Sequence, residues 1–422
     1  MSEKLKITES SCQDDFDQNS LTADEALERI LAAISPLEET ETVPIRRGLD
    51  RILAEDVYSR INVPNCINSA MDGYAVRGED IPSDGIRQLL VIGTVFAGSP
   101  LTESIGPGAC ARIMTGGVLP AGTDTVVIQE HVERRDDHIL IDNRTHKGDN
   151  VREAGEDVRM GEQILSRGAR LTPAAIGLMA SLGTAEVLVT RRPKVAFFST
   201  GDELRSIGEE LHDGQVYDSN RYTLYGMLQR LGIETIDMGV VRDDRAEVEQ
   251  AFQDAAASAD VVITSGGVSV GEADYVKETL AQLGTIDFWK IAIKPGRPLA
   301  FGMINNSYFF GLPGNPVSVM VTFYQFVQPA LYRLMGSNFI EPVSTHAICL
   351  SRLGKRPGRV EYQRGIMSRD ENGRLVVRKT GAQGSGILSS MSQANCFIIL
   401  PMENTGGEAG MEVEIQPFHG LI

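Results

Sequence analysis

The chain has 422 residues, which is too long for one compact core and predicts about three domains. Its formal net charge of −17 at pH 7 argues against general nucleic-acid binding, because phosphate backbones recruit basic surfaces. No apolar run approaches the roughly 20 residues that cross a bilayer, and the first residues lack a signal-peptide pattern, so we expect a cytoplasmic protein without a membrane partner. The cysteines occur singly, which predicts idle or buried thiols rather than a zinc or redox site: Cys12, Cys66, Cys110, Cys349 and Cys396.

The N-terminal segment changes character after about twenty residues. Residues 1–20 are acidic and polar without an apolar period, which predicts a disordered tail. The following stretch, TADEALERILAAI, places apolar residues at helical spacing. Thr22 and Glu25 form a capping-box pattern at its start, so a helix is expected from there.

A β-rich segment is expected to interrupt the N-terminal region. Residues 62–147 are strand-like and rich in turns, as in GACARIMTGGVLPAGTDTVVIQE. We therefore predict an inserted β domain there, flanked by the two parts, 21–61 and 148–190, of a discontinuous linker domain. The second part contains a predicted helix with Pro173 in its first turn and Gly183 at its end.

The C-terminal half is expected to hold two further domains. In residues 191–336, the apolar strands KVAFFST, ETIDMGVV, DVVITSGG and SYFFGLPG alternate with predicted helices such as DSNRYTLYGMLQRLG and PVSVMVTFYQFVQPAL. This alternation predicts a doubly wound, mostly parallel sheet covered on both faces. Residues 337–422 return to short strands and Gly/Pro turns, which suit a small β-barrel or a sandwich, and we expect the barrel. The expected fold class is therefore multidomain, α/β and β.

Two glycine-containing turns follow predicted strands of the parallel sheet. Ligands bind beyond the carboxyl ends of such strands, and backbone N–H groups of glycine turns can approach an anion closely. Gly266 and Gly267 have the strand–turn–helix context of a phosphate loop, although glycines also make plain turns. The second turn, GLPGNP in residues 311–316, is either a ligand loop or a stiff turn that opens a helix.

A small basic group stands out in this acidic protein. The segment KIAIKPGRPLAFG carries Lys290, Lys294 and Arg297. If the chain is extended, alternating positions put the two lysines on one face. We interpret the group as an anion pocket; the alternative is a solvated edge strand whose lysines discourage pairing.

Several carboxylates are candidate magnesium ligands, because Mg²⁺ prefers oxygen ligands and substrate phosphates. Each could instead be a helix cap or a turn residue. No Ser-His-Asp or Cys-His arrangement supports covalent catalysis. The candidates are Glu203, Asp243, Asp274, Asp72 and Asp157.

Five motifs, taken in order, resemble the MoeA family of molybdopterin molybdenumtransferases. They are NSAMDGYAV (68–76), STGDEL (199–204), SGGVSVGEADY (265–275), KPGRPLAFG (294–302) and GLPGNPVSVMV (311–321). The chain is also similar to the C-terminal half of gephyrin and to the corresponding plant domain. The resemblance extends from about Thr22 to the C-terminus.

The resemblance implies a Mg²⁺-dependent enzyme that inserts molybdate into adenylylated molybdopterin and releases AMP. It further implies a homodimer of four-domain subunits whose third domain is similar to the adenylyltransferase that makes the substrate. That adenylyltransferase and the recipient molybdoenzymes would be its protein partners. We expect the enzyme to act through positioning and charge stabilisation.

The resemblance also implies roles for individual residues. A catalytic set would comprise Asp274, Glu203, Asp72 and Lys294, and the metal would be held by Glu203, Asp243 and Asp274. The pterin and phosphates would contact Thr200, Ser265, Gly266, Gly267, Pro313, Gly314, Asn315 and Pro316. The anions would be surrounded by Lys290, Lys294, Arg297, Pro298, Arg364 and Ser385. The N-terminal region, across the dimer, would supply Asp72, Thr115, Arg152 and Asp157.

Two other functions fit the same domain type. The first is the adenylyltransferase itself, but the adenylating enzymes carry Gly-Gly-Thr-Gly where this chain has Val268 and Ser269 after its two glycines. The second is a scaffold without activity, as in the receptor-anchoring branch of gephyrin, but no fused partner domain or long linker is present in this sequence. Release of AMP, consumption of ATP, or neither distinguishes the three.

Overall fold

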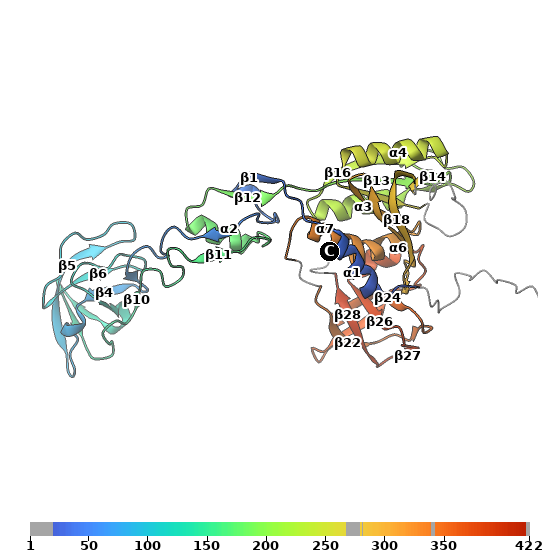
Figure 1. Cartoon of the computed structure of the whole chain (residues 1–422). Helices are drawn as coiled ribbons and strands as arrows, with labels where there is room; N and C mark the ends of the chain where they lie inside the picture. The colour runs from blue at the N-terminus through green and yellow to red at the C-terminus, as the bar shows by residue number, and fades with distance from the viewer. Residues whose placement is uncertain (1–19, 267–278, 281, 339–341, 419–422) are drawn as a thin grey trace, which may run out of the picture. The chain divides into compact units, whose positions relative to one another are not determined.

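The computed structural model describes residues 20–266, 279–280, 282–338 and 342–418 (Figure 1). The chain divides into two compact units. One comprises Met1–Glu41, Asp50–Ile52 and Val189–Ile422, and the other comprises Thr42–Leu49 and Leu53–Leu188. Each unit is described by itself.

The centre of the larger unit is a six-stranded sheet. Its order is β16 (Glu234–Val241), β13 (Lys194–Thr200), β17 (Val261–Ser265), β21 (Ser307–Leu312), β20 (Pro298–Ile304) and β18 (Gly284–Lys290). The first four strands run parallel to one another, β20 is antiparallel to β21, and β18 is antiparallel to β20.

Helices cover both faces of this sheet (Figure 1). Successive residues of β13 point to opposite faces, so Phe197 packs in a cluster with α3 (Ser219–Arg230), whereas Phe198 packs in another with α4 (Arg245–Ser258). Because both faces are buried, the strand is apolar at consecutive positions. The first face also receives α1 (Ala23–Ala33) and a continuous helical run composed of α6 (Pro316–Thr322), a π-helical turn (Phe323–Val327) and α7 (Gln328–Leu334).

The C-terminal strands form a closed barrel. The order is β24 (Val360–Arg369), β25 (Leu375–Lys379), β22 (Thr345–Cys349), β28 (Glu412–Pro417) and β26 (Cys396–Leu400), and β26 pairs with β24 again. This closure leaves the five strands without a free edge. A short strand, β19 (Ile293–Lys294), runs parallel to β24. The barrel segment also includes α8 (Leu388–Gln393), and β23 (Leu353–Gly354) pairs with β27 (Gly406–Gly407).

The second unit is built on a mixed sheet. Its order is β7 (Thr125–Ile128), β4 (Gly73–Val76), β6 (Ala109–Ile113), β5 (Arg87–Val95), β9 (His138–Ile141) and β8 (Glu133–Arg135). Apolar clusters lie on both of its faces, so the consecutive β4 residues Tyr74 and Ala75 belong to different clusters. Helix α2 (Pro173–Ser181) belongs to the same unit.

The remaining short strands pair in two-stranded sheets. These pairs are β1 (Thr40–Pro44) with β12 (Glu186–Thr190), β2 (Val57–Tyr58) with β11 (Gln163–Leu165), β3 (Asn68–Ser69) with β10 (Val151–Arg152), and β14 (Leu204–Arg205) with β15 (Val216–Tyr217). Short 3₁₀ turns occur at Ile45–Arg47, Gly78–Asp80 and Gln129–His131.

The predicted fold class is confirmed. Both features of the capping box are present at the start of α1, where the Thr22 hydroxyl accepts from the Glu25 N–H and the Glu25 carboxylate accepts from the Thr22 N–H. Most of the helix predicted after the Gly266–Gly267 turn lies outside the described residues. The five-part domain division stays a prediction. Within the described ranges, no helix is long and apolar enough to span a membrane.

Candidate functional site

Three parallel strands of the central sheet end side by side. In the register of β13, β17 and β21, Ser199 lies opposite Ser265, which in turn lies opposite Leu312. The two serine Oγ atoms are 2.8 Å apart, and the Gly266 N–H donates to the Leu312 carbonyl over 3.1 Å. The next residues along each strand are therefore neighbours. The predicted residues brought together at this edge are Thr200, Ser265, Gly266, Pro313, Gly314, Asn315 and Pro316.

Close backbone contacts explain the glycine at position 266. Its φ of 91° is unfavourable for other residues, and an added Cβ would lie 2.8 Å from the Thr200 carbonyl oxygen. Gly314 approaches from the other side, with its ideal Cβ position 3.9 Å from the Gly266 Cα atom. The loops at this edge therefore pack backbone against backbone. Gly267 lies outside the described residues.

Carboxylates gather at the ends of β13 and β16. The Asp243 N–H donates to the Asp202 Oδ1 atom over 3.3 Å. Burial, followed by the negative charges of Asp202 and Glu203, raises the pKa of Asp243 above its ordinary value. No set of three potential ligands surrounds a common point among the residues that the structure describes. Asp274, the third predicted metal ligand, lies outside them.

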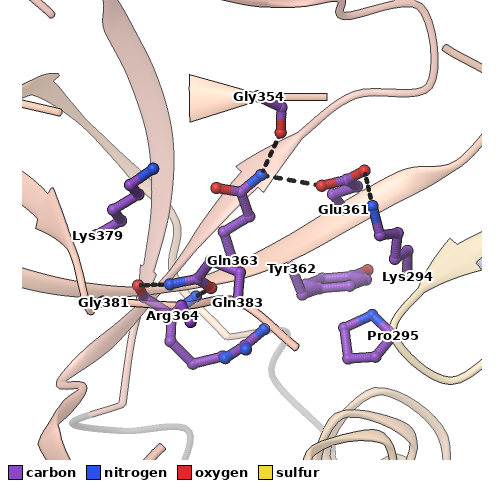
Figure 2. A pocket seen from close by; sticks show the side chains of 11 residues that line it. Lys294, Pro295, Gly354, Glu361, Tyr362, Gln363, Arg364, Lys379, Gly381 and Gln383 are labelled. Atoms are coloured by element: carbon purple, nitrogen blue, oxygen red, sulfur yellow. Dashed lines mark hydrogen bonds and ion pairs between the residues drawn. The ribbon is translucent and has the colours of Figure 1, made fainter. Parts of the chain in front are cut away.

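A pocket of about 240 Å³ lies where the central sheet domain meets the barrel (Figure 2). Lys294 Nζ is 2.9 Å from Glu361 Oε1, and the Gln363 Nε2 group donates to Glu361 Oε2 over 2.9 Å and to the Gly354 carbonyl over 3.0 Å. Lys294 is thus held by a buried carboxylate that is itself fixed by an amide. The lining residues are Lys294, Pro295, Gly354, Glu361, Tyr362, Gln363, Arg364, Lys379, Gly381, Ala382 and Gln383.

Arg364 is the most unusual residue of this pocket, because only 1% of it is exposed. Its guanidinium donates to the Ser390 Oγ atom over 3.0 Å and to the Gly384 carbonyl over 2.9 Å, both neutral acceptors. Burial lowers the pKa of Arg364 to about 10, although the charge of Glu361 opposes this shift. A desolvated cation with neutral hydrogen-bond partners favours the binding of an anion.

Backbone contacts connect Arg364 to the loop after β21. Gly384, which accepts from Arg364, precedes Ser385 in the chain, and the Ser385 carbonyl accepts from the Val317 N–H over 3.0 Å. Val317 is the second residue of α6, directly after the GLPGNP turn. The predicted residues Arg364 and Ser385 are therefore physically joined to the predicted loop.

The expectation that Lys290 and Lys294 alternate on one extended strand is wrong. Lys290 is the last residue of β18 and lies opposite Pro298, whereas Lys294 belongs to β19 and lies beside Glu361. The chain turns between them, because the Ile291 N–H donates to the Arg297 carbonyl over 2.7 Å. Lys290 and Lys294 thus approach different parts of the molecule, and of Lys290, Lys294 and Arg297 only Lys294 is among the described residues that line the pocket.

The predicted residues of the second unit form separate local contacts. Asp72 Oδ1 accepts from both the N–H and the hydroxyl of Thr115, each over 2.8 Å, and these bonds lower the pKa of Asp72. Arg152 Nε lies 3.8 Å from Glu156 Oε1. Asp157 lines an open pocket of about 520 Å³ in the same unit.

Sequence reasoning missed Glu361 and Gln363, which fix Lys294. One signal was present: the strand sequence VEYQRG carries polar residues at three of its six positions. Polar side chains in a strand next to predicted core segments are unusual, because buried polar groups need partners.

Three family patterns together cover most of the chain. The MoeA N-terminal region (domain I and II) matches residues 21–183, a probable molybdopterin binding domain matches 196–333, and the MoeA C-terminal region (domain IV) matches 346–418.

Similar whole proteins show the same correspondence. The chain is 46% identical to a molybdopterin molybdenumtransferase of Haemophilus influenzae, over 95% of this chain and 100% of that protein. It is 37% identical to one of Nostoc, over 89% and 88% of the two chains. A crystal structure of the molybdopterin biosynthesis moeA protein from Pyrococcus horikoshii has a TM-score of 0.82 and 31% identity, covering 94% of this chain and 100% of the other. This protein therefore belongs to the MoeA family.

Proposed function

We propose that this protein acts in molybdenum cofactor biosynthesis by inserting molybdate into adenylylated molybdopterin with release of AMP. Its relatives carry the name molybdopterin molybdenumtransferase, and their similarity extends over 95% and 89% of this chain, which supports the reaction class. The observation that carries the proposal within the structure is the pocket around Arg364, whose buried cation has neutral hydrogen-bond partners. Molybdate is a dianion and the substrate contains a pyrophosphate, so both match this electrostatic environment.

In the proposed reaction, the pocket around Arg364 and the glycine turns at the sheet edge bind different parts of the substrates. Arg364 and Lys294 stabilise negative charge in the pocket, and the backbone at Gly266 and in the turn before α6 binds phosphate oxygens. Water attacks the adenylyl phosphorus, the bond between that phosphorus and the bridging pyrophosphate oxygen breaks, and AMP leaves. The two dithiolene thiols of molybdopterin bond to molybdenum and displace one molybdate oxygen as water, with no change of oxidation state. The protein contributes positioning and charge stabilisation and forms no covalent bond to the substrate.

We further propose that Mg²⁺ assists the departure of AMP. Glu203, Asp243 and Asp274 would hold it, with the remaining ligands supplied by water and phosphate oxygens. The raised pKa of Asp243 fits this role, because a group of carboxylates that disfavours its own ionisation gains from a bound cation. Bound Mg²⁺ would neutralise charge on the pyrophosphate.

A homodimer is part of the proposal. In this proposal, Asp72, Thr115, Arg152 and Asp157 of one subunit would lie near the substrates bound by the other. The ordered Asp72–Thr115 pair suits such a role, because two donors keep the Asp72 carboxylate ionised. Sedimentation at micromolar concentration tests the homodimer; a monomer contradicts it.

We also propose that the protein is located in the cytoplasm. The adenylyltransferase would supply its substrate, and molybdoenzymes would receive its product.

The test of the function is a reconstituted reaction. Purified protein is incubated with adenylylated molybdopterin, sodium molybdate and MgCl₂, and AMP is quantified by chromatography. Molybdate-dependent release of AMP supports the proposal. Consumption of ATP in the presence of molybdopterin, or no nucleotide chemistry at all, refutes it.

A further inference from the structure

The turn before α6 is held by a side chain from another helix. Asn220, the second residue of α3, donates from Nδ2 to the Gly314 carbonyl over 2.7 Å. Only 7% of Asn220 is exposed. The first turn of α3 is itself fixed, because Asp218 caps it by accepting from the Arg221 N–H over 3.2 Å. The contact therefore joins a rigid helix start to the middle of the turn.

This contact determines how one peptide group of the turn is oriented. Gly314 and Asn315 are joined by a trans peptide bond, so the Gly314 carbonyl and the Asn315 N–H point in opposite directions. Because the carbonyl points to α3, the N–H points away from it. No described residue accepts a hydrogen bond from this N–H. The next residue, Pro316, has no N–H, which makes the Asn315 N–H the last donor before α6.

Stability alone does not explain an asparagine at position 220. Its Oδ1 atom is buried and has no hydrogen-bond partner among the described residues. An unpaired buried acceptor costs about as much as the neighbouring hydrogen bond contributes. A leucine of similar shape would avoid that cost. We therefore attribute the asparagine to the hydrogen bond that its amide donates to the Gly314 carbonyl.

We infer that Asn220 is a positioning residue, which presents the Asn315 N–H to an anionic oxygen of the substrate. The inference rests on the proposed function, because that function supplies the phosphate-bearing substrate. The distance and the burial of the contact make Asn220 the side chain that links α3 to this turn. Loss of the donor lets the peptide rotate, and the turn then loses a preorganised donor.

Asn220→Asp provides a test with a distinctive pH profile. At high pH the aspartate is ionised, repels the Gly314 carbonyl and cannot donate. Its burial beside a carbonyl favours the neutral acid, whose O–H donates to the same carbonyl and restores the orientation. We expect the ratio of variant to wild-type kcat/KM for AMP release to be at least about fivefold higher at pH 6 than at pH 8. Asn220→Leu, which lacks a donor at every pH, is expected to lose about tenfold in kcat/KM at both, equivalent to about 1.4 kcal/mol.

The matched control is Asn395→Asp in the barrel. Asn395 also donates from Nδ2 to a backbone carbonyl over 3.0 Å, but its acceptor is Met367 of the barrel strand β24 and not a residue of the turn. Its variant-to-wild-type ratio is expected to stay constant between pH 6 and pH 8. Thermal unfolding of each protein at both pH values shows whether the variants remain folded, and ratios are compared only below the unfolding range.

Binding of AMP, measured by calorimetry on the same proteins, separates this inference from the proposed function. If the wild type binds AMP but releases none from the substrate, the proposed function fails and the AMP affinities of the position-220 variants still decide the inference. Equal affinities and equal rates for wild type and Asn220→Leu overturn the inference, as does a flat pH ratio for Asn220→Asp. A wild type that does not bind AMP overturns both.

Discussion

Removing the charge of Arg364 should separate ligand binding from stability. Burial lowers its pKa to about 10, against about 12.5 for arginine in water. At 1.36 kcal/mol per pKa unit, holding this cation costs the folded state roughly 3 kcal/mol at neutral pH. The cost is present below pH 10 and disappears as the pH rises further, because the folded protein then releases the proton first.

Arg364→Met keeps most of the volume and removes both the charge and its cost. The variant also loses the hydrogen bonds to Ser390 and Gly384, which contribute roughly 1.5–3 kcal/mol each for a charged donor. The cost of the cation that is removed and the hydrogen bonds that are lost nearly cancel, or the variant is modestly less stable than the wild type. We therefore expect the free energy of unfolding to change by no more than about 3 kcal/mol.

Anion binding should respond much more strongly. A unit charge pair at 4 Å contributes roughly 4 kcal/mol at an effective dielectric constant of 20, and desolvation of the anion offsets part of this. A loss of about 2–4 kcal/mol corresponds to a roughly 30- to 700-fold higher Kd. Calorimetric titration with sodium molybdate measures it directly.

A matched control lies on the same strand. Arg369, at the exposed end of β24, donates to the Gly373 carbonyl over 2.7 Å and does not line the pocket. Arg369→Met removes the same charge and should leave the Kd for molybdate within about twofold. If Arg364→Met binds molybdate as tightly as this control, the assignment of the pocket as an anion site is wrong.

Three other substitutions test neighbouring parts of the site. Glu361→Gln keeps the side-chain shape beside Lys294 and Gln363 but removes a negative charge from the pocket. We therefore expect calorimetry to show a lower Kd for molybdate; a higher Kd would mean that the carboxylate is needed to hold Lys294. Asp243→Asn should raise the Tm at pH 7.5, because the raised pKa means that the ionised form costs stability. The gain should fade as the pH falls towards about 4, the ordinary aspartate value, because the folded protein takes up the proton first. The same variant should bind Mg²⁺ less tightly, and an unchanged affinity would exclude Asp243 as a ligand. Asp274→Asn, a prediction from the sequence alone, should lower AMP release by about 100-fold or more, roughly 3 kcal/mol, with little change in Tm; normal turnover would reduce this residue to a structural role.

Local patterns made most of the fold predictable. The capping box at Thr22 and Glu25 acts over three residues, and the buried strands are marked by short apolar runs such as KVAFFST. The parallel order then places the carboxyl ends of these strands at one edge, where Thr200 and Gly266 are in contact.

The pocket could not be derived in the same way. Lys294 and Glu361 are 67 residues apart and meet only because β19 pairs with β24. The expectation that Lys290 and Lys294 share a face assumes one continuous strand, but the chain turns after Lys290. The contact of Asn220 with Gly314 spans 94 residues and depends on how α3 packs near α6. Such pairings are set by tertiary packing and leave no local spacing to read.

The pairing of β24 with β19, β25 and β26 has a thermodynamic consequence. The strand that closes the barrel also carries Glu361, Gln363 and Arg364, so the binding groups exist in their arrangement only while the barrel is closed. Occupancy of the pocket and opening of the barrel are therefore linked equilibria: a bound anion adds RT ln(1 + [L]/Kd) to the free energy of opening. Amide protons of β26 and β28, far along the sequence from the ligand, thus exchange more slowly as the anion concentration rises, and the barrel serves as an internal reporter of occupancy.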